Sequence, residues 1–85
     1  MTIDMCDPKT WPGWPLLAIR RKDTGAKGTL MDVGGQPRNV IHETCAKVRA
    51  MIDRGGDPLT ELNGSDELTC ENVADDWEVD ASNKE

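Results

Sequence analysis

The sequence LLAIRRKDTGAKGTLMDV, residues 16–33, predicts a β-hairpin. Its two apolar runs, residues 16–22 and 29–33, flank a turn that contains Asp23 and Gly25, and Asp and Gly between such runs are typical of hairpin loops. Alternate residues of a strand point to opposite faces of the sheet. Met31 and Val33 therefore share one face, which we expect to be the core face.

A helix is predicted from Gln36 or Asn39 to about Arg54. Pro37 suits a first helical turn, and Gly55-Gly56 end the pattern. Apolar side chains recur between these limits at helical spacing, at Ile41, Cys45, Val48 and Ile52.

The C-terminal third gives weaker signals. Residues 57–62 suit one helical turn, and Thr69 suits the N-cap of a second turn that ends at residues 75–76. Trp77-Glu78-Val79 alternates as a strand does. The predicted fold class is therefore α+β, with a small antiparallel sheet, formed by the N-terminal hairpin and a short C-terminal strand, packed on one main helix.

We expect three regions in a chain of 85 residues. Residues 1–14 form an extended arm rich in Trp and Pro, residues 15–80 form a single domain, and residues 81–85 form a frayed acidic tail. The three cysteines are odd in number and widely spaced, which indicates free thiols and a cytoplasmic setting. No apolar run is long enough to span a membrane, so no membrane association is expected.

Charge is divided unevenly along the chain. The formal net charge is −6, yet residues 1–56 carry nine Lys and Arg against six acids, whereas residues 57–85 carry ten acids and one Lys. We expect the fold to place a cationic hairpin at one pole and an anionic flank at the other, an arrangement suited to docking. The predicted partner-binding acidic face comprises Asp57, Glu61, Asp66, Glu67, Glu71, Asp75, Asp76 and Glu78.

Two interpretations of these charges stay open. The basic residues Arg20, Arg21 and Lys22 could clamp phosphates, or they could be solvated edge-strand charges that prevent sheet aggregation. The acidic residues could imitate a polyanion and occupy a nucleic-acid-binding groove on another protein, or they could serve solubility alone. Direct nucleic-acid binding is not expected from so acidic a chain.

No catalytic or metal-binding signature is present in the sequence. His42 and Cys45 lie three residues apart, but the further ligands of a zinc site are missing, and so is an orienting third group for a Cys–His pair. The glycines at positions 25, 28, 34 and 35 lack the Lys and Ser/Thr of a phosphate loop. We therefore predict no enzyme activity, no metal and no cofactor.

The segment LTCENVADDWEV, residues 68–79, resembles the C-terminus of a family of small phage proteins, the Thoeris anti-defence proteins of the second type. The resemblance implies a small, oligomeric α+β protein that sequesters a cyclic nucleotide immune signal without cleaving it. It also implies a cytoplasmic location in the infected bacterial host. Only Trp77 and its neighbours correspond by position.

Two functional hypotheses follow. The first is a non-enzymatic, phage-encoded inhibitor of bacterial immunity that sequesters a nucleotide signal as a homo-oligomer, with Arg20, Arg21 and Lys22 on the phosphates, Trp14 stacked on a base, and Trp77 nearby. The alternative is an acidic protein, comparable to anti-CRISPR proteins, that binds a host defence protein and blocks its DNA or RNA site. A generic structural or adaptor role is a third possibility.

Replacing Trp77 with Ala tests the expected contribution of Trp77 to the core. Removing a buried aromatic side chain costs about 3–5 kcal/mol, which is enough to unfold a domain of this size at ambient temperature. Thermal melting followed by circular dichroism measures this loss. A variant that melts like the wild type would refute the prediction.

Overall fold

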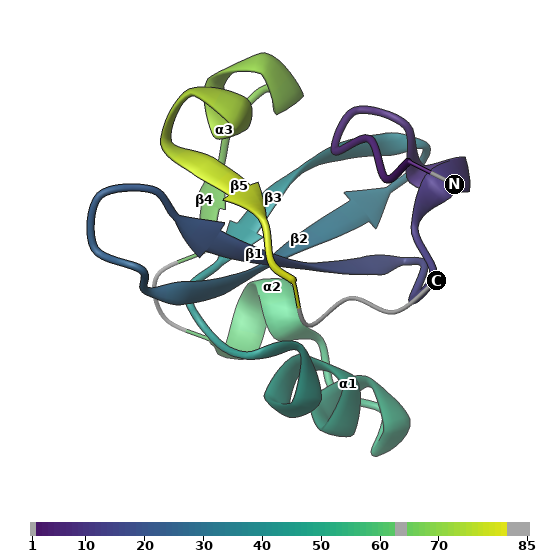
Figure 1. The fold of residues 1–85 in the computed structure, drawn as a ribbon. Coiled ribbons are helices and arrows are strands. Elements are labelled where there is room, and N and C mark those ends of the chain that lie inside the picture. The colour runs from purple at the N-terminus through teal and green to yellow at the C-terminus, as the bar shows by residue number, and fades with distance from the viewer. Residues whose placement is uncertain (1, 63–64, 82–85) are drawn as a thin grey trace.

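The computed structural model describes residues 2–62 and 65–81, and shows one antiparallel sheet with helices on both faces (Figure 1). Its five strands lie in the order β4-β3-β2-β1-β5, and each neighbouring pair is antiparallel. The elements are a 3-10 turn η1 (Pro8–Thr10), β1 (Leu16–Arg21), β2 (Lys27–Val33), β3 (Gln36–Ile41), α1 (Cys45–Asp53), α2 (Pro58–Glu61), β4 (Ser65–Glu67), α3 (Cys70–Asp76) and β5 (Trp77–Val79).

The predicted first hairpin is confirmed. β1 pairs with β2 in a continuous register from Leu16 opposite Met31 to Arg20 opposite Lys27. The predicted C-terminal strand is confirmed too, because β5 pairs with β1 and places Trp77 opposite Arg21. The helical turns α2 and α3 form where the sequence predicts them, and Thr69 Oγ1 caps α3 by accepting a hydrogen bond from the backbone of Asn72.

The predicted long helix is wrong over nearly half of its length, residues 36–44. Residues 36–41 form β3, and α1 begins only at Cys45, with Thr44 as its N-cap. Gly34 and Gly35 have φ of +64° and +82°, the two positive values that a two-residue hairpin loop of type I′ requires. These glycines thus join β2 directly to β3, and Pro37 lies in a strand next to a register shift between Met31 and Asp32.

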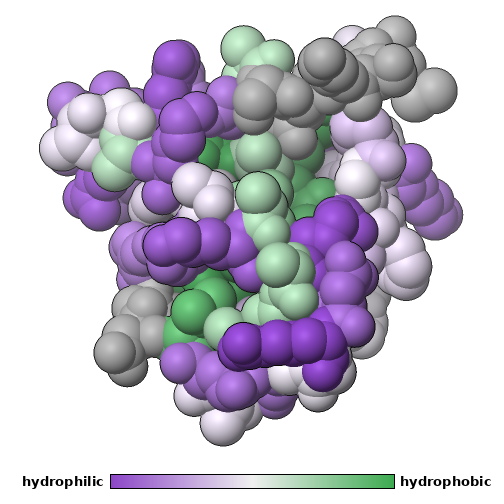
Figure 2. Space-filling model, turned by 90° about the horizontal axis from the view of Figure 1, so that it is seen from below, coloured by the Kyte–Doolittle hydropathy of each residue, from purple (hydrophilic) through white to green (hydrophobic). Residues whose placement is uncertain are grey.

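The helices α1 and α2 cover one face of the sheet. Val48 is fully buried there against Leu16 of β1 and Ile41 of β3. The residues of the predicted apolar stripe therefore pack in one cluster, although Ile41 belongs to a strand and not to the helix. Figure 2, which views this side, shows a narrow band of hydrophobic surface between hydrophilic flanks. The surface on this side therefore contains both hydrophobic and hydrophilic residues.

The arm and α3 cover the opposite face. Residues 2–15 are turned rather than extended, and Met5 and Trp11 pack with Leu17, Leu30 and the α3 residue Val73. Met5 and Trp11 of the arm are thus part of the core. Both sheet faces are buried, so the expectation of a single core face is wrong, and Val33 is 43% exposed.

The indole of Trp77 crosses the sheet from one edge towards the other. A Cβ added to Gly28 of β2 would lie 2.7 Å from Trp77 Cζ3, so the ring rests on the bare backbone of that glycine. The His42 ring packs edge-on against the indole at 5.6 Å, and His42 Nε2 shares a 2.7 Å hydrogen bond with Asp66 Oδ2 on β4. Contacts from Trp77 thereby link the outer strand β5 to the opposite outer strand.

The α+β class is confirmed, but the finer prediction is not. Within residues 2–62 and 65–81 the sheet has five strands instead of the three predicted. Helix α1 spans nine residues, and α2, α3 and the arm also cover the sheet. Residues 82–85 of the predicted tail lie outside the described residues.

Gly28→Ala tests the close packing of Trp77. The new methyl group would overlap the indole, and overpacking of this kind costs about 1–3 kcal/mol. Urea unfolding measures the loss. Gly13→Ala is the control, since a Cβ there stays 3.4 Å from its nearest neighbours and should change the free energy of unfolding by less than about 0.5 kcal/mol. Equal stability of the two variants would contradict the packing.

Candidate functional site

The basic residues of the first hairpin lie against acidic residues of the C-terminus. Arg20 donates two hydrogen bonds to Glu78 Oε1, through Nε at 3.1 Å and Nη2 at 2.5 Å, and Lys27 Nζ lies 3.4 Å from Asp80 Oδ2. The bond to Glu78 raises the pKa of the Arg20 guanidinium. Lys22 Nζ donates to the carbonyl of Ala74 in α3. The expectation of separate cationic and anionic poles is wrong along this seam between β1 and β5.

The predicted ligand residues do not form one site. Trp14 precedes the start of β1, whereas Arg20 and Arg21 lie at its far end, a strand length of roughly 16 Å at about 3.3 Å per residue. Arg21 pairs with Asp23 and lies over the Trp77 ring at 6.0 Å. Trp77 is only 3% exposed, so it acts as a core residue.

The predicted acidic face is also divided. Asp57 is the N-cap of α2 and Glu61 is its last residue, so both lie on one side of the sheet. Glu61 lies 3.9 Å from Arg54 there. Asp66 and Glu67 lie on β4, and Glu78 is paired with Arg20. The remaining three acids, Glu71, Asp75 and Asp76, project from α3 on the other side and are exposed.

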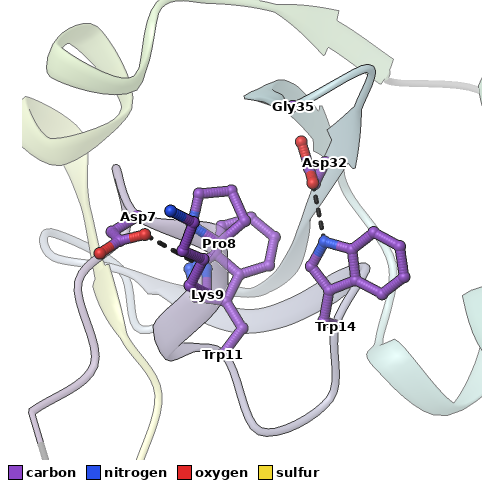
Figure 3. A pocket seen from close by; sticks show the side chains of 7 residues that line it. All are labelled: Asp7, Pro8, Lys9, Trp11, Trp14, Asp32 and Gly35. Atoms are coloured by element: carbon purple, nitrogen blue, oxygen red, sulfur yellow. Dashed lines mark hydrogen bonds between the residues drawn. The ribbon is translucent and has the colours of Figure 1, made fainter.

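A pocket of about 580 Å³ opens between the arm and the β2–β3 hairpin (Figure 3). We call it the Trp14 pocket. Trp11 is 4% exposed and forms part of its wall, whereas Trp14 is 60% exposed and presents an indole to solvent. Its lining residues are Asp7, Pro8, Lys9, Trp11, Trp14, Asp32 and Gly35.

Asp32 fixes the orientation of Trp14. Its Oδ2 accepts a 2.7 Å hydrogen bond from Trp14 Nε1, as the dashed line in Figure 3 shows. Asp32 is 9% exposed, and its buried Oδ1 has no hydrogen-bond partner among the residues that the structure describes. A buried carboxylate oxygen without a donor is costly, which makes this position a candidate ligand contact.

The arm residues of this pocket are held by local hydrogen bonds. Asp7 Oδ1 accepts from the backbone N–H of Lys9, and Trp11 Nε1 donates to the carbonyl of Asp4 at 2.9 Å. Lys9 is exposed. The pocket therefore combines an exposed indole held by Asp32, two carboxylates and one exposed ammonium.

The sequence predicted Trp14 but missed Asp32, Asp7, Lys9 and Trp11. One signal was available for Asp32, an acid inside the apolar run Leu30-Met31-Asp32-Val33, where a charge needs a structural or functional reason. The other three come near Asp32 only because the arm folds back over the sheet.

The pKa values of two thiols, Cys45 and Cys70, are raised. Burial raises the pKa of Cys45, whose sulfur accepts a hydrogen bond from Thr29 Oγ1 at 3.4 Å. A hydrogen bond with Cys6 raises the pKa of Cys70 to about 12. Neither group is an activated nucleophile, because the thiolate is the reactive form.

Residues 2–62 and 65–81 contain no cluster of three or more His, Cys, Asp or Glu side chains that could hold a metal ion. None of the helices in those ranges is both long and apolar enough to cross a bilayer.

No protein-family model matches the chain, and comparisons with curated proteins and with solved structures give no match either.

The raised pKa of Cys70 predicts its reactivity with iodoacetamide. Well below a pKa of about 12 the thiolate fraction rises about tenfold per pH unit, so the alkylation rate of native Cys70 should keep rising through pH 10. Peptide mapping by mass spectrometry measures this rate residue by residue. A rate that levels off below pH 9 would show an ordinary or activated thiol.

Proposed function

We propose that this protein is a non-enzymatic inhibitor that binds a basic surface on a nucleic-acid-handling protein. The observation that carries the proposal is that the basic side chains of the hairpin are paired within the chain, whereas acidic side chains of α3 are exposed. The hairpin cations Arg20, Arg21 and Lys27 are paired with acids of the same chain. The carboxylates of Asp75 and Asp76 on α3 are exposed, so they remain available to a basic partner.

The exposed side of α3 is the strongest part of this surface. Asp75 and Asp76 are exposed, and their side chains make no hydrogen bond or ion pair with the described part of the chain. The last turn of α3 thus combines two carboxylates with the negative end of a short helix. Such a surface attracts cationic patches, accelerates encounter and repels anions.

Inhibition by such a surface needs no bond-breaking. A protein that covers a groove lined by Lys and Arg prevents phosphate backbones from entering, because both compete for the same cations. The likeness of residues 68–79 to phage anti-defence proteins supports a target in bacterial immunity and action in the cytoplasm of an infected host. Self-association of the chain stays a prediction.

Sequestration of a nucleotide is a second candidate, and the Trp14 pocket favours it. An exposed indole is a stacking platform for a base, and Lys9 at the rim could meet one phosphate. The predicted phosphate clamp of Arg20, Arg21 and Lys22 is not part of this nucleotide site. Those side chains lie at the far end of β1 and already bind other groups of the chain.

Asp75→Lys tests the proposed function. Bacteria that carry nucleic-acid-handling defence systems would express the protein and be challenged with phage, and complexes would be examined by native mass spectrometry. Reversing a central charge should weaken the complex about tenfold, the equivalent of about 1.4 kcal/mol. The affinity of the complex should also fall as the salt concentration rises, and duplex DNA should compete with the inhibitor for the target.

Asp53→Lys is the matched control. Asp53 is likewise exposed in the last turn of a helix, α1, on the other side of the sheet, and the substitution changes net charge equally. A Lys is favourable near the C-terminal end of a helix, and both substitutions lie at such an end, so both variants should fold. Equal behaviour of the two variants would contradict the proposal. A nucleotide released from the purified protein on denaturation would favour the second candidate.

A further inference from the structure

The Trp14 pocket contains an anionic group that the protein itself leaves incompletely satisfied. A carboxylate accepts several hydrogen bonds, yet Asp32 receives one on its side chain, from Trp14 Nε1 to Oδ2. Oδ1 is buried and receives none from the described residues. No described Lys, Arg or His forms an ion pair with Asp32. The missing component is a hydrogen-bond donor that carries positive charge.

The walls of the pocket restrict the shape of that donor. The indole of Trp14 stands on one side and that of Trp11 on the other, with Pro8 beside it (Figure 3). Gly35 adds no side chain at the hairpin end of the pocket. A flat group therefore fits best, because it can stack on an indole while its edge faces Asp32.

A guanidinium group meets both requirements. It is planar, always charged and carries several N–H donors in one plane, and it stacks on aromatic rings while it binds a carboxylate. An ammonium has the charge but no plane to stack. A nucleobase has the plane but no charge to offset a buried anion.

We propose that the Trp14 pocket is a socket for an arginine side chain of the partner protein, with the guanidinium stacked on Trp14 and bonded to Asp32. This inference rests on the proposed function, since the arginine belongs to the basic surface that the inhibitor covers. Trp and Arg are also the residues that most often dominate protein interfaces. Asp7 at the rim adds a second negative charge, and the exposed Lys9 forms no ion pair with Asp32 that would occupy the place of the guest.

Entry of the guest requires a small rearrangement. Oδ1 is covered in the free protein and Oδ2 is bonded to Trp14 Nε1, so the guanidinium must replace that bond or displace a neighbour of Oδ1. The hydrogen bond to Asp32 holds the indole in the free protein, and once this bond is replaced the ring, which is 60% exposed, can move towards solvent. The side-chain N–H resonance of Trp14 is therefore the most direct reporter of binding.

The test is a titration of ¹⁵N-labelled protein with the peptide acetyl-Gly-Arg-Gly-amide, followed through the Trp14 indole N–H. The peptide should shift this resonance in a saturable way. The citrulline peptide has the same shape without the charge, and should bind about tenfold more weakly or not at all. The lysine peptide should also be weaker, because it cannot stack.

Two variants locate the binding. Asp32→Asn keeps the shape of the side chain and should abolish the difference between arginine and citrulline peptides. Asp53→Asn on α1, which lies outside both proposed binding features, should leave it unchanged. Trp14→Ala removes a largely exposed ring and should fold, so loss of binding, seen at Trp11, tests the socket even if Asp32→Asn is unstable.

Three results would overturn the inference: equal binding of arginine and citrulline peptides, no saturable shift, or a stronger response to guanosine monophosphate. The last would assign the pocket to the nucleotide candidate. If the peptide titration fails but Asp75→Lys has a specific effect in the phage assay, the arginine socket is refuted and the proposed function stands. Failure of both would remove the proposed function.

Discussion

The packing of the Trp77 indole on Gly28 is the contact on which the rest of the structure depends. The ring can lie there only because β2 has no side chain at that position, where a Cβ would meet it at 2.7 Å. From this position Trp77 contacts Arg21 and His42, and His42 reaches Asp66 on the outermost strand. A three-residue strand, β5, is thereby held at the edge of the sheet although its backbone pairing is short.

This anchoring explains where the charges go. With β5 beside β1, Glu78 faces Arg20, and Asp80 beyond the strand faces Lys27. The uneven charge of the sequence therefore serves first to match the C-terminal strand with the hairpin. What remains for a partner is the exposed acidic side of α3 and the Trp14 pocket, which both lie on the sheet face covered by α3 and the arm. The two proposed binding features thus belong to one side of the molecule.

Local signals in the sequence predicted what depends on local chemistry. Turn residues and apolar runs gave the first hairpin, and Thr69 gave the start of α3. The helix prediction failed at residues 36–44, because Pro37 suits a helix start as well as a strand beside a bulge. The positive φ angles of Gly34 and Gly35 identify a hairpin loop, which a Gly-Gly pair also permits at the level of sequence. The pairing of Arg20 with Glu78 spans 58 residues, and the approach of the arm to Asp32 depends on tertiary packing, so neither could be read from spacing.

The most direct measurement of the central contact is the NMR chemical shift of the Gly28 α-protons. Protons beneath an indole face are shielded by its ring current. We expect at least one Gly28 α-proton far upfield of its random-coil position, with nuclear Overhauser effects to the Trp77 ring. Random-coil shifts at Gly28 without such effects would contradict the account.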